Sequence, residues 1–194
     1  MAWETLRYSL ISSCPMIMHN GQTADPLNKF AKALKKVSSK RVKTDADYEE
    51  MARIEFMAGL YISADGPVLP THVIDATVVN AAKKNKEGTL AKSSVFCLTH
   101  SVLQYDGPRN ADELWQDERF RKVSIVRVGQ ARVARTRPVF DAWQCVVELQ
   151  VENTLVNPSR VDEWMFVAGT QVGFCDWRPQ FGRFQVQRLQ VFAV

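Results

Sequence analysis

Residues 142–152 constrain the fold most, because apolar and polar side chains alternate there almost without exception. Successive side chains of a β-strand point to opposite faces, so this alternation indicates a strand with one buried face and one solvated face. After Ala142, Val146 is the one apolar residue on the solvated side. The residues predicted to face the core are Trp143, Cys145, Val147, Leu149 and Val151.

Two local signals indicate helix starts in the first third of the chain. Asp25-Pro26 combines a preferred N-cap residue with a proline at the first helical position, which predicts a helix over residues 26–38. Thr44 and Asp47 have the spacing of a capping box and predict a short second helix. From about Arg53 the apolar period becomes two, which predicts a strand over residues 54–63.

Weaker patterns predict the other elements. Strands are expected at residues 4–12, 93–100, 101–105, 122–128, 131–137 and 184–192, with a hairpin turn at Gly129-Gln130, and helices at 71–88, 111–118 and 158–168. Mixed elements with hairpins predict an α+β fold on a mainly antiparallel sheet, with a ferredoxin-like or RRM-like core and a helical insertion. The sequence contains no long linker, so residues 1–194 are predicted to form one domain.

The charges of the chain are segregated although its net charge is only +4 at pH 7. Residues 29–43 and residues 119–137 each contain seven basic residues and no acid. Such segregation is typical of a surface that binds polyanions, although solvated faces without a partner can also produce it. The candidate contacts in the first run and the loop after it are Lys35, Lys36, Lys40, Arg41 and Lys43.

The sequence lacks the common motifs of metal, nucleotide and acyl-transfer chemistry. Its three histidines are far apart without a recognised ligand spacing, and it has no Walker A, G-x-G-x-x-G or G-x-S-x-G sequence. We therefore expect no metal and no cofactor. Four cysteines without C-x-x-C spacing favour reduced thiols in the cytoplasm, and the absence of a long apolar run favours a protein without membrane association.

His19 is the one residue with a catalytic hypothesis. It follows the first predicted strand and precedes the turn Asn20-Gly21. A histidine beside a basic groove can act as general base in metal-independent RNA cleavage. A loop histidine without a chemical role is the simpler interpretation.

The segment from Gly173 to Phe184 is distinctive because it combines glycine, arginine and aromatic residues between a helix and the last strand. Glycine permits close backbone approach, arginine offers forked donors to phosphate, and aromatic rings can stack on bases. The candidate site residues here are Trp177, Arg178, Phe181 and Arg183. In the alternative interpretation, the rings pack into the core and Arg178 pairs with Asp176 or Asp141.

Arg135 and Arg137 are two further candidates. They are two residues apart on a predicted strand and therefore point to one face. We expect the loop at residues 173–184 to lie beside them at the edge of the sheet and to form one continuous basic surface with them.

Two segments resemble the CRISPR-associated RAMP superfamily. Residues 66–70, Gly-Pro-Val-Leu-Pro, precede a helix containing Ala81-Ala82-Lys83-Lys84, and the terminal helix, glycine-containing loop and strand resemble that superfamily's G-rich loop. Thr71-His72 stands where the superfamily has paired serines. The resemblance implies an RRM-like core that binds nucleic-acid backbone and often stacks into filaments.

Most of the chain also resembles small uncharacterised proteins of tailed bacteriophages. The segments that carry this resemblance are 47–50, 52–56, 105–109, 135–143 and 173–184. It implies a phage-encoded protein in the host cytoplasm, without indicating a function.

Together these features predict a non-catalytic protein that binds single-stranded RNA or DNA through backbone contacts, as a homo-oligomer or in a larger ribonucleoprotein. The alternative is a protein-interaction or assembly factor, such as a phage modulator of a host complex, because the aromatic residues could supply an interface. The second alternative is a metal-independent ribonuclease that uses His19.

Overall fold

The alternating segment forms β9 (Gln144–Glu152), a central strand of a four-stranded sheet in the computed structural model, which describes residues 2–190. The neighbours of β9 are β1 (Trp3–Ser12) and β5 (Val95–Cys97), and β10 (Phe184–Leu189) lies beyond β1. Every pair in the order β10-β1-β9-β5 is antiparallel. The predicted inner face is confirmed, since Trp143, Cys145, Val147, Leu149 and Val151 are all buried.

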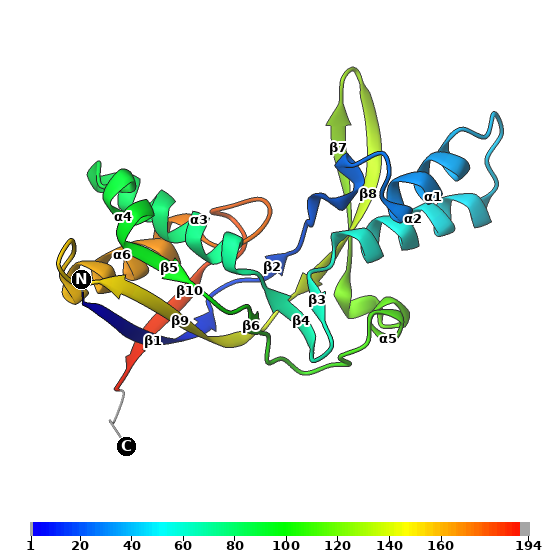
Figure 1. Ribbon diagram of the computed structural model, residues 1–194. Coiled ribbons are helices and arrows are strands. Elements are labelled where there is room, and N and C mark those ends of the chain that lie inside the picture. The colour runs from blue at the N-terminus through cyan, green and yellow to red at the C-terminus, as the bar shows by residue number, and fades with distance from the viewer. Residues whose placement is uncertain (1, 191–194) are drawn as a thin grey trace.

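Helices cover one face of this sheet, and the other face is open. The covering helices are α3 (Thr71–Ala82), α4 (Gly88–Ser94) and α6 (Pro158–Val167) (Figure 1). On the open face Arg7 pairs with Glu148 at 2.8 Å, and Ile11 and Val146 are exposed. Helix α6 ends at Val167, one residue before the predicted end at residue 168, and the chain continues through a π-helical turn, Ala168–Val172.

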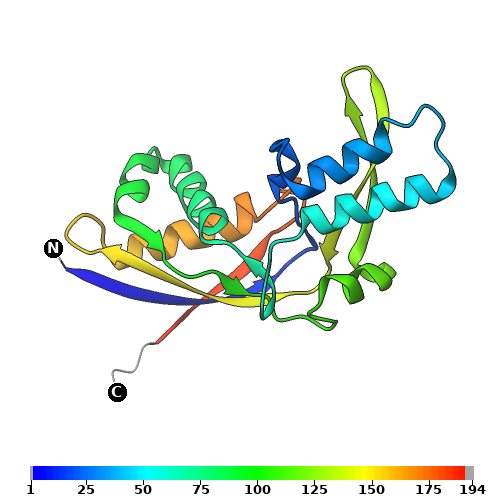
Figure 2. The ribbon, with the colours of Figure 1, turned by 45° about the vertical axis from the view of Figure 1, so that its right-hand side comes forward.

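A second group of elements lies beside the sheet. The predicted hairpin is confirmed as β7 (Arg121–Val128) and β8 (Ala131–Phe140), and β2 (Met16–Ile17) pairs with the base of β8. Helices α1 (Lys29–Ser38) and α2 (Asp45–Gly59) run side by side next to this hairpin, with α5 (Ala111–Gln116) near its base (Figures 1 and 2).

Short elements connect the two groups. β3 (Ile62–Ser63), β4 (Gly66–Leu69) and β6 (Ser101–Val102) form a small third sheet. Single 3-10 turns lie at Gly21–Ala24, Lys83–Asn85 and Glu118–Phe120. One contiguous apolar cluster extends from Leu6, Leu149 and Trp164 at the sheet to Phe56 and Trp115 between α2 and α5.

The strand predicted over residues 54–63 is wrong, because α2 remains helical to Gly59. Its start is as predicted, with the complete capping box of Thr44 and Asp47. Packing against α1, β8 and α5 buries several sides of the helix, so Ile54, Phe56 and Ala58 are all buried and imitate a two-residue period. A helix covered on more than one side loses the simple apolar stripe from which it is predicted.

Several predicted boundaries also change. Helix α1 begins at Lys29 instead of residue 26, because the side chain of Asn28 accepts the hydrogen bond from Phe30 N, while Asp25 forms a turn by accepting from Leu27 N. Helix α3 ends at Ala82, and α4 continues through Ser94, so the extended run starts only at Val95. The last two residues of the strand predicted at 184–192 lie outside the described residues. Within those residues, no helix combines the length and apolar character needed to span a bilayer.

Candidate nucleic-acid interface

Two glycines hold the ends of the loop between α6 and β10 in close backbone contact. Gly173 and Gly182 have φ values of +78° and +77°. A Cβ atom at Gly182 would lie 2.1 Å from the carbonyl oxygen of Phe174, and Phe174 N donates to Gly182 O at 2.9 Å. Gly182 N also donates to Pro15 O at 2.8 Å. The structure thus confirms the close approach expected of these glycines.

The aromatic residues in and beside the loop differ in how far they are buried. Phe174 and Phe184 are buried and stacked, with ring centroids 4.4 Å apart. Trp177 and Phe181 are half-buried and meet edge to face at 5.9 Å. The Lys122 ammonium lies 5.3 Å from the Phe181 ring centroid. Trp177 and Phe181 therefore combine packing with a surface that remains partly accessible.

Arg135 and Arg137 lie on β8, the middle strand of the separate sheet β2-β8-β7 instead of an edge, and both are paired with acids. Arg135 forms an ion pair with Glu55 of α2, and the same carboxylate accepts a hydrogen bond from Thr136 N at 2.9 Å. Arg137 pairs with Asp176 of the loop. The loop does lie beside Arg137, but it contributes an acid there, so this part of the surface is internally neutralised.

Arg178 and Arg183 are exposed. Asp176, which the sequence offered as a partner for Arg178, pairs with Arg137 instead. No ion pair to either arginine is found among the described residues. The loop therefore contains two exposed arginines together with the half-buried rings of Trp177 and Phe181.

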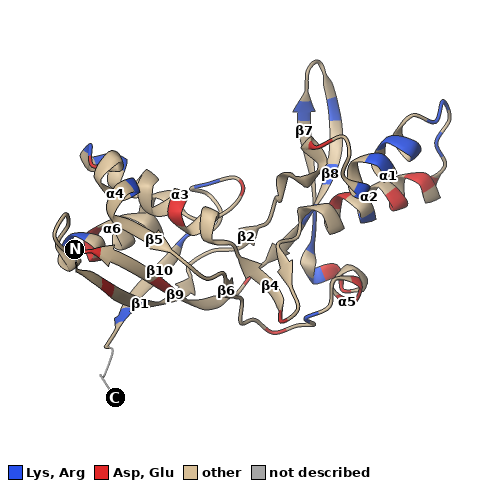
Figure 3. Ribbon diagram, viewed as in Figure 1, with Lys and Arg blue, Asp and Glu red and all other residues tan. Residues whose placement is uncertain are grey.

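The candidates in the first basic run lie at the end of α1 and in the α1–α2 connection. Lys35, Lys36 and Arg41 are exposed. Lys40 pairs with Asp47 at 2.5 Å, and Lys43 Nζ donates to Lys40 O at 2.9 Å. Basic residues gather on α1, this connection and the hairpin, whereas acids lie along α2 and α5 (Figure 3).

His19 lies between two pockets that only the tertiary structure assembles. A pocket of about 390 Å³ is lined by His19, Asn20, Glu55, Arg135 and Arg137 among others. A smaller pocket of about 190 Å³ on its other side is lined by His19, Tyr61, His72, Cys175, Asp176 and Arg178, with Val73 and Ala76. Burial and the nearby charges of Arg137 and Arg135 lower the pKa of His19 below 6.5. Sequence reasoning missed His72 and Tyr61, because no local pattern relates them to His19.

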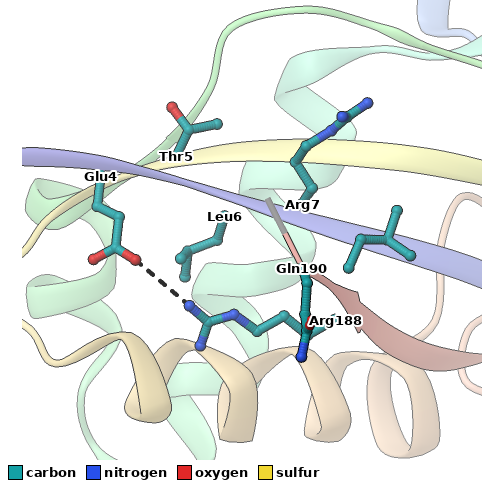
Figure 4. A pocket seen from close by; sticks show the side chains of 7 residues that line it. Glu4, Thr5, Leu6, Arg7, Arg188 and Gln190 are labelled. Atoms are coloured by element: carbon teal, nitrogen blue, oxygen red, sulfur yellow. Dashed lines mark ion pairs between the residues drawn. The ribbon is translucent and has the colours of Figure 1, made fainter. Parts of the chain in front are cut away.

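A wider pocket of about 780 Å³ lies at the far end of β1 and β10 (Figure 4). Its lining includes Glu4, Arg7 and Arg188, and Arg188 is held by Glu4 at 3.5 Å and by Asp162 at 3.0 Å. None of the candidate residues from the sequence lies there, so this pocket does not extend the interface.

We next consider groups of metal-ligating side chains and the four cysteine thiols. The described residues contain no group of three or more His, Cys, Asp or Glu side chains that could hold a metal ion. All four cysteines are free thiols, and burial raises the pKa of Cys145 and of Cys175 to about 12. Thiols with a raised pKa are poor nucleophiles, because the thiolate is the reactive form.

No model of a known protein family matches this chain, and no curated protein matches it either.

Proposed function

We propose that this protein binds single-stranded nucleic acid, RNA or DNA, through contacts to the backbone. The observation that carries the proposal is one loop that combines exposed Arg178 and Arg183 with the half-buried rings of Trp177 and Phe181. Arginine forks fit phosphate oxygens, and each base stacked on an aromatic side chain contributes about 1–3 kcal/mol. The same loop therefore offers both kinds of contact that a single strand needs.

The strand order also supports the proposal. The chain passes from β1 through α3 to β5, then to β9, and through α6 to β10, giving the order β10-β1-β9-β5. We propose that this is a ferredoxin-like core, with α1 and α2 inserted before α3 and the β7–β8 hairpin inserted before β9. This interpretation agrees with the RAMP resemblance, from which we also propose assembly into oligomers or a ribonucleoprotein. The phage origin and cytoplasmic location that we propose rest on the separate phage resemblance.

The α6–β10 loop and the inserted elements, rather than the open sheet face, form the proposed interface. On the open face the Arg7 guanidinium is already paired with Glu148. By contrast, α1 and the α1–α2 connection present Lys35, Lys36 and Arg41 to solvent. Exposed lysines contribute diffuse attraction, so reversing the charge of Lys35 and Lys36 should weaken binding equally for all sequences and flatten the salt dependence.

The proposal is tested with the double variant Arg178→Ala/Arg183→Ala. Binding of a fluorescent single-stranded oligonucleotide is measured by anisotropy at several salt concentrations. We expect weaker binding and a shallower salt slope at an unchanged melting temperature. The control Lys84→Ala/Lys92→Ala removes the same charge from exposed positions near α3 and on α4, and should bind more tightly than the arginine variant. Equal binding by both variants, or no binding by the parent at low salt, would contradict the proposal.

A second candidate function, protein interaction or assembly, is favoured by one observation. Val123 and Ile125 share a face of the hairpin and are 63% and 66% exposed. Large apolar side chains that are this exposed often mark a protein interface. Two results together would favour this candidate over nucleic-acid binding. The parent would bind no oligonucleotide, and it would form a protein complex that the variant Val123→Ser/Ile125→Ser does not form.

A further inference from the structure

Strand β7 has an open hydrogen-bonding edge along the β7–β8 hairpin. It is the outer strand in the order β2-β8-β7, and the tip of the hairpin projects beyond the neighbouring elements (Figures 1 and 2). Helix α2 covers the other edge of the hairpin, where Thr136 N of β8 donates to Glu55 at 2.9 Å. β7 is eight residues long and contains no proline. An exposed strand of this kind is a template for pairing with another chain.

The register of the hairpin determines which backbone groups face the open edge. Val128 and Ala131 flank the turn and are hydrogen-bonded partners, so every second residue of β7 before Val128 also bonds to β8. The residues between them, Val123, Ile125 and Arg127, therefore direct their N–H and C=O groups away from β8. No backbone group within residues 2–190 bonds to them on that side. They offer alternating donors and acceptors to a further strand.

Both edges of the four-stranded sheet, in contrast, are partly covered. β5 is only three residues long, and Cys97 N donates to the Asp75 side chain of α3 at 2.8 Å. The Phe184 oxygen of β10 lies against Gly169, where a Cβ atom would approach it to 2.2 Å. Proteins commonly block exposed strand edges, because an open edge pairs with other chains. In the described part of this chain nothing comparable covers β7, so its edge suits a partner strand.

The side chains along this edge indicate the composition of the partner. Val123 and Ile125 lie on one face of the hairpin and are both exposed. Residues 119–137 contain seven basic residues and no acid, and Arg127 and Arg132 near the tip are exposed. A second copy of the hairpin would bring like charges together, which opposes pairing. A strand that combines apolar and acidic residues complements both the apolar side chains and the charge.

We propose that β7 binds an extended acidic segment of a partner protein by β-strand addition. The backbone of the segment pairs with Val123, Ile125 and Arg127, its apolar side chains cover Val123 and Ile125, and its carboxylates face the arginines near the tip. A peptide strand supplies donors for the C=O groups of this edge, whereas phosphate oxygens only accept hydrogen bonds. A peptide therefore fits the edge better than a phosphate backbone does. This inference goes beyond nucleic-acid binding and does not depend on it.

The probe is a fluorescent peptide of alternating valine and glutamate, as long as β7. Its binding is measured by anisotropy, and hydrogen exchange follows the amides of Val123, Ile125 and Arg127. We expect binding that weakens as salt rises, and slower exchange of these amides in the complex. The same peptide methylated at the nitrogens that would face β7 keeps its charges but loses those donors, and should bind about tenfold more weakly.

Two variants of the protein test the edge itself. Ile125→Pro removes one outward N–H and leaves the hydrogen bonds to β8 in place, and should weaken peptide binding about tenfold. Val123→Ser/Ile125→Ser should weaken it about fivefold or more. Ile11→Ser/Val146→Ser is the matched control, because it removes two exposed apolar side chains from the open face of the other sheet, and it should bind like the parent. Melting temperatures verify that each variant folds.

The results separate strand addition from simple charge attraction. The inference is overturned if the parent does not bind the valine–glutamate peptide, or if it binds the methylated form or a valine–lysine peptide equally well. It is also overturned if Val123→Ser/Ile125→Ser weakens oligonucleotide binding and leaves peptide binding unchanged, because the hairpin then belongs to the nucleic-acid interface. Arg178→Ala/Arg183→Ala should bind the peptide like the parent, so failure of this inference and failure of the proposed function are distinguishable.

Discussion

Replacing Glu55 with glutamine should strengthen the binding of single-stranded nucleic acid, because it frees a cation in the proposed interface. Glu55 pairs with Arg135, and their side chains are 12% and 33% exposed. The amide oxygen of the introduced glutamine can still accept the hydrogen bond from Thr136 N, but it no longer neutralises Arg135. One additional phosphate contact should then form where the 390 Å³ pocket opens.

The size of the effect follows from counterion release. Each phosphate contact adds about 0.7 to the slope of log affinity against log salt for single strands, so a fourfold rise in salt should cost the variant about 2.6-fold more affinity than the parent. Hydrogen bonds to charged groups are stronger than neutral ones, so we expect Glu55→Gln to lower the free energy of unfolding by about 1 kcal/mol.

The assay is oligonucleotide anisotropy over a salt series, with urea unfolding as the measure of stability. Glu49→Gln is the matched control, because Glu49 lies exposed on the same helix and its replacement removes the same charge. If the salt dependence of affinity is the same for Glu55→Gln and Glu49→Gln, the bound nucleic acid does not pass Arg135. That result would refute the proposed position of the interface.

Three further predictions concern stability. Gly182→Ala places a methyl group against the backbone of Phe174 and should lower the unfolding free energy by on the order of 1–3 kcal/mol, seen as a lower melting temperature. Val147→Asp buries an unpaired charge and should cost several kcal/mol in urea unfolding, whereas Val146→Asp on the open face of β9 should cost much less; equal losses would contradict the assigned faces. The folded protein resists protonation of His19, whose pKa lies below 6.5, whereas the unfolded chain takes up the proton near 6.5. Stability should therefore fall as pH drops below about 6.5, and His19→Gln should show a smaller fall in pH-dependent thermal melts; an identical pH profile would contradict the depressed pKa.

Local sequence signals were sufficient to predict an element where one of its faces is solvated, or where a cap or turn requires particular residue types. The alternation of β9, the capping box of Thr44, and the hairpin turn at Gly129 were all predicted and are all present. In each case the physical cause lies within a few neighbouring residues. Gly173 and Gly182 likewise indicated close backbone contact, which the structure places within the loop itself.

Tertiary packing determined the features that local sequence signals did not predict. The second half of α2 was predicted as a strand because α1, β8 and α5 together bury residues that a helix covered on one side would expose. The pairing of Arg135 with Glu55 and of Arg137 with Asp176 joins residues far apart in the chain, so a run of basic residues alone could not show which cations are neutralised.

The pocket at His19 also combines features that the sequence determines with features that only the tertiary structure determines. The sequence by itself determined that an imidazole follows the first strand and that an arginine lies in the terminal loop. Only the folded chain brings His72 and Tyr61 to them, because α3 and the segment before β3 approach the loop through contacts between distant parts of the chain. Spacing along a sequence predicts a site when its residues share one element; a site assembled from four segments depends on the tertiary structure.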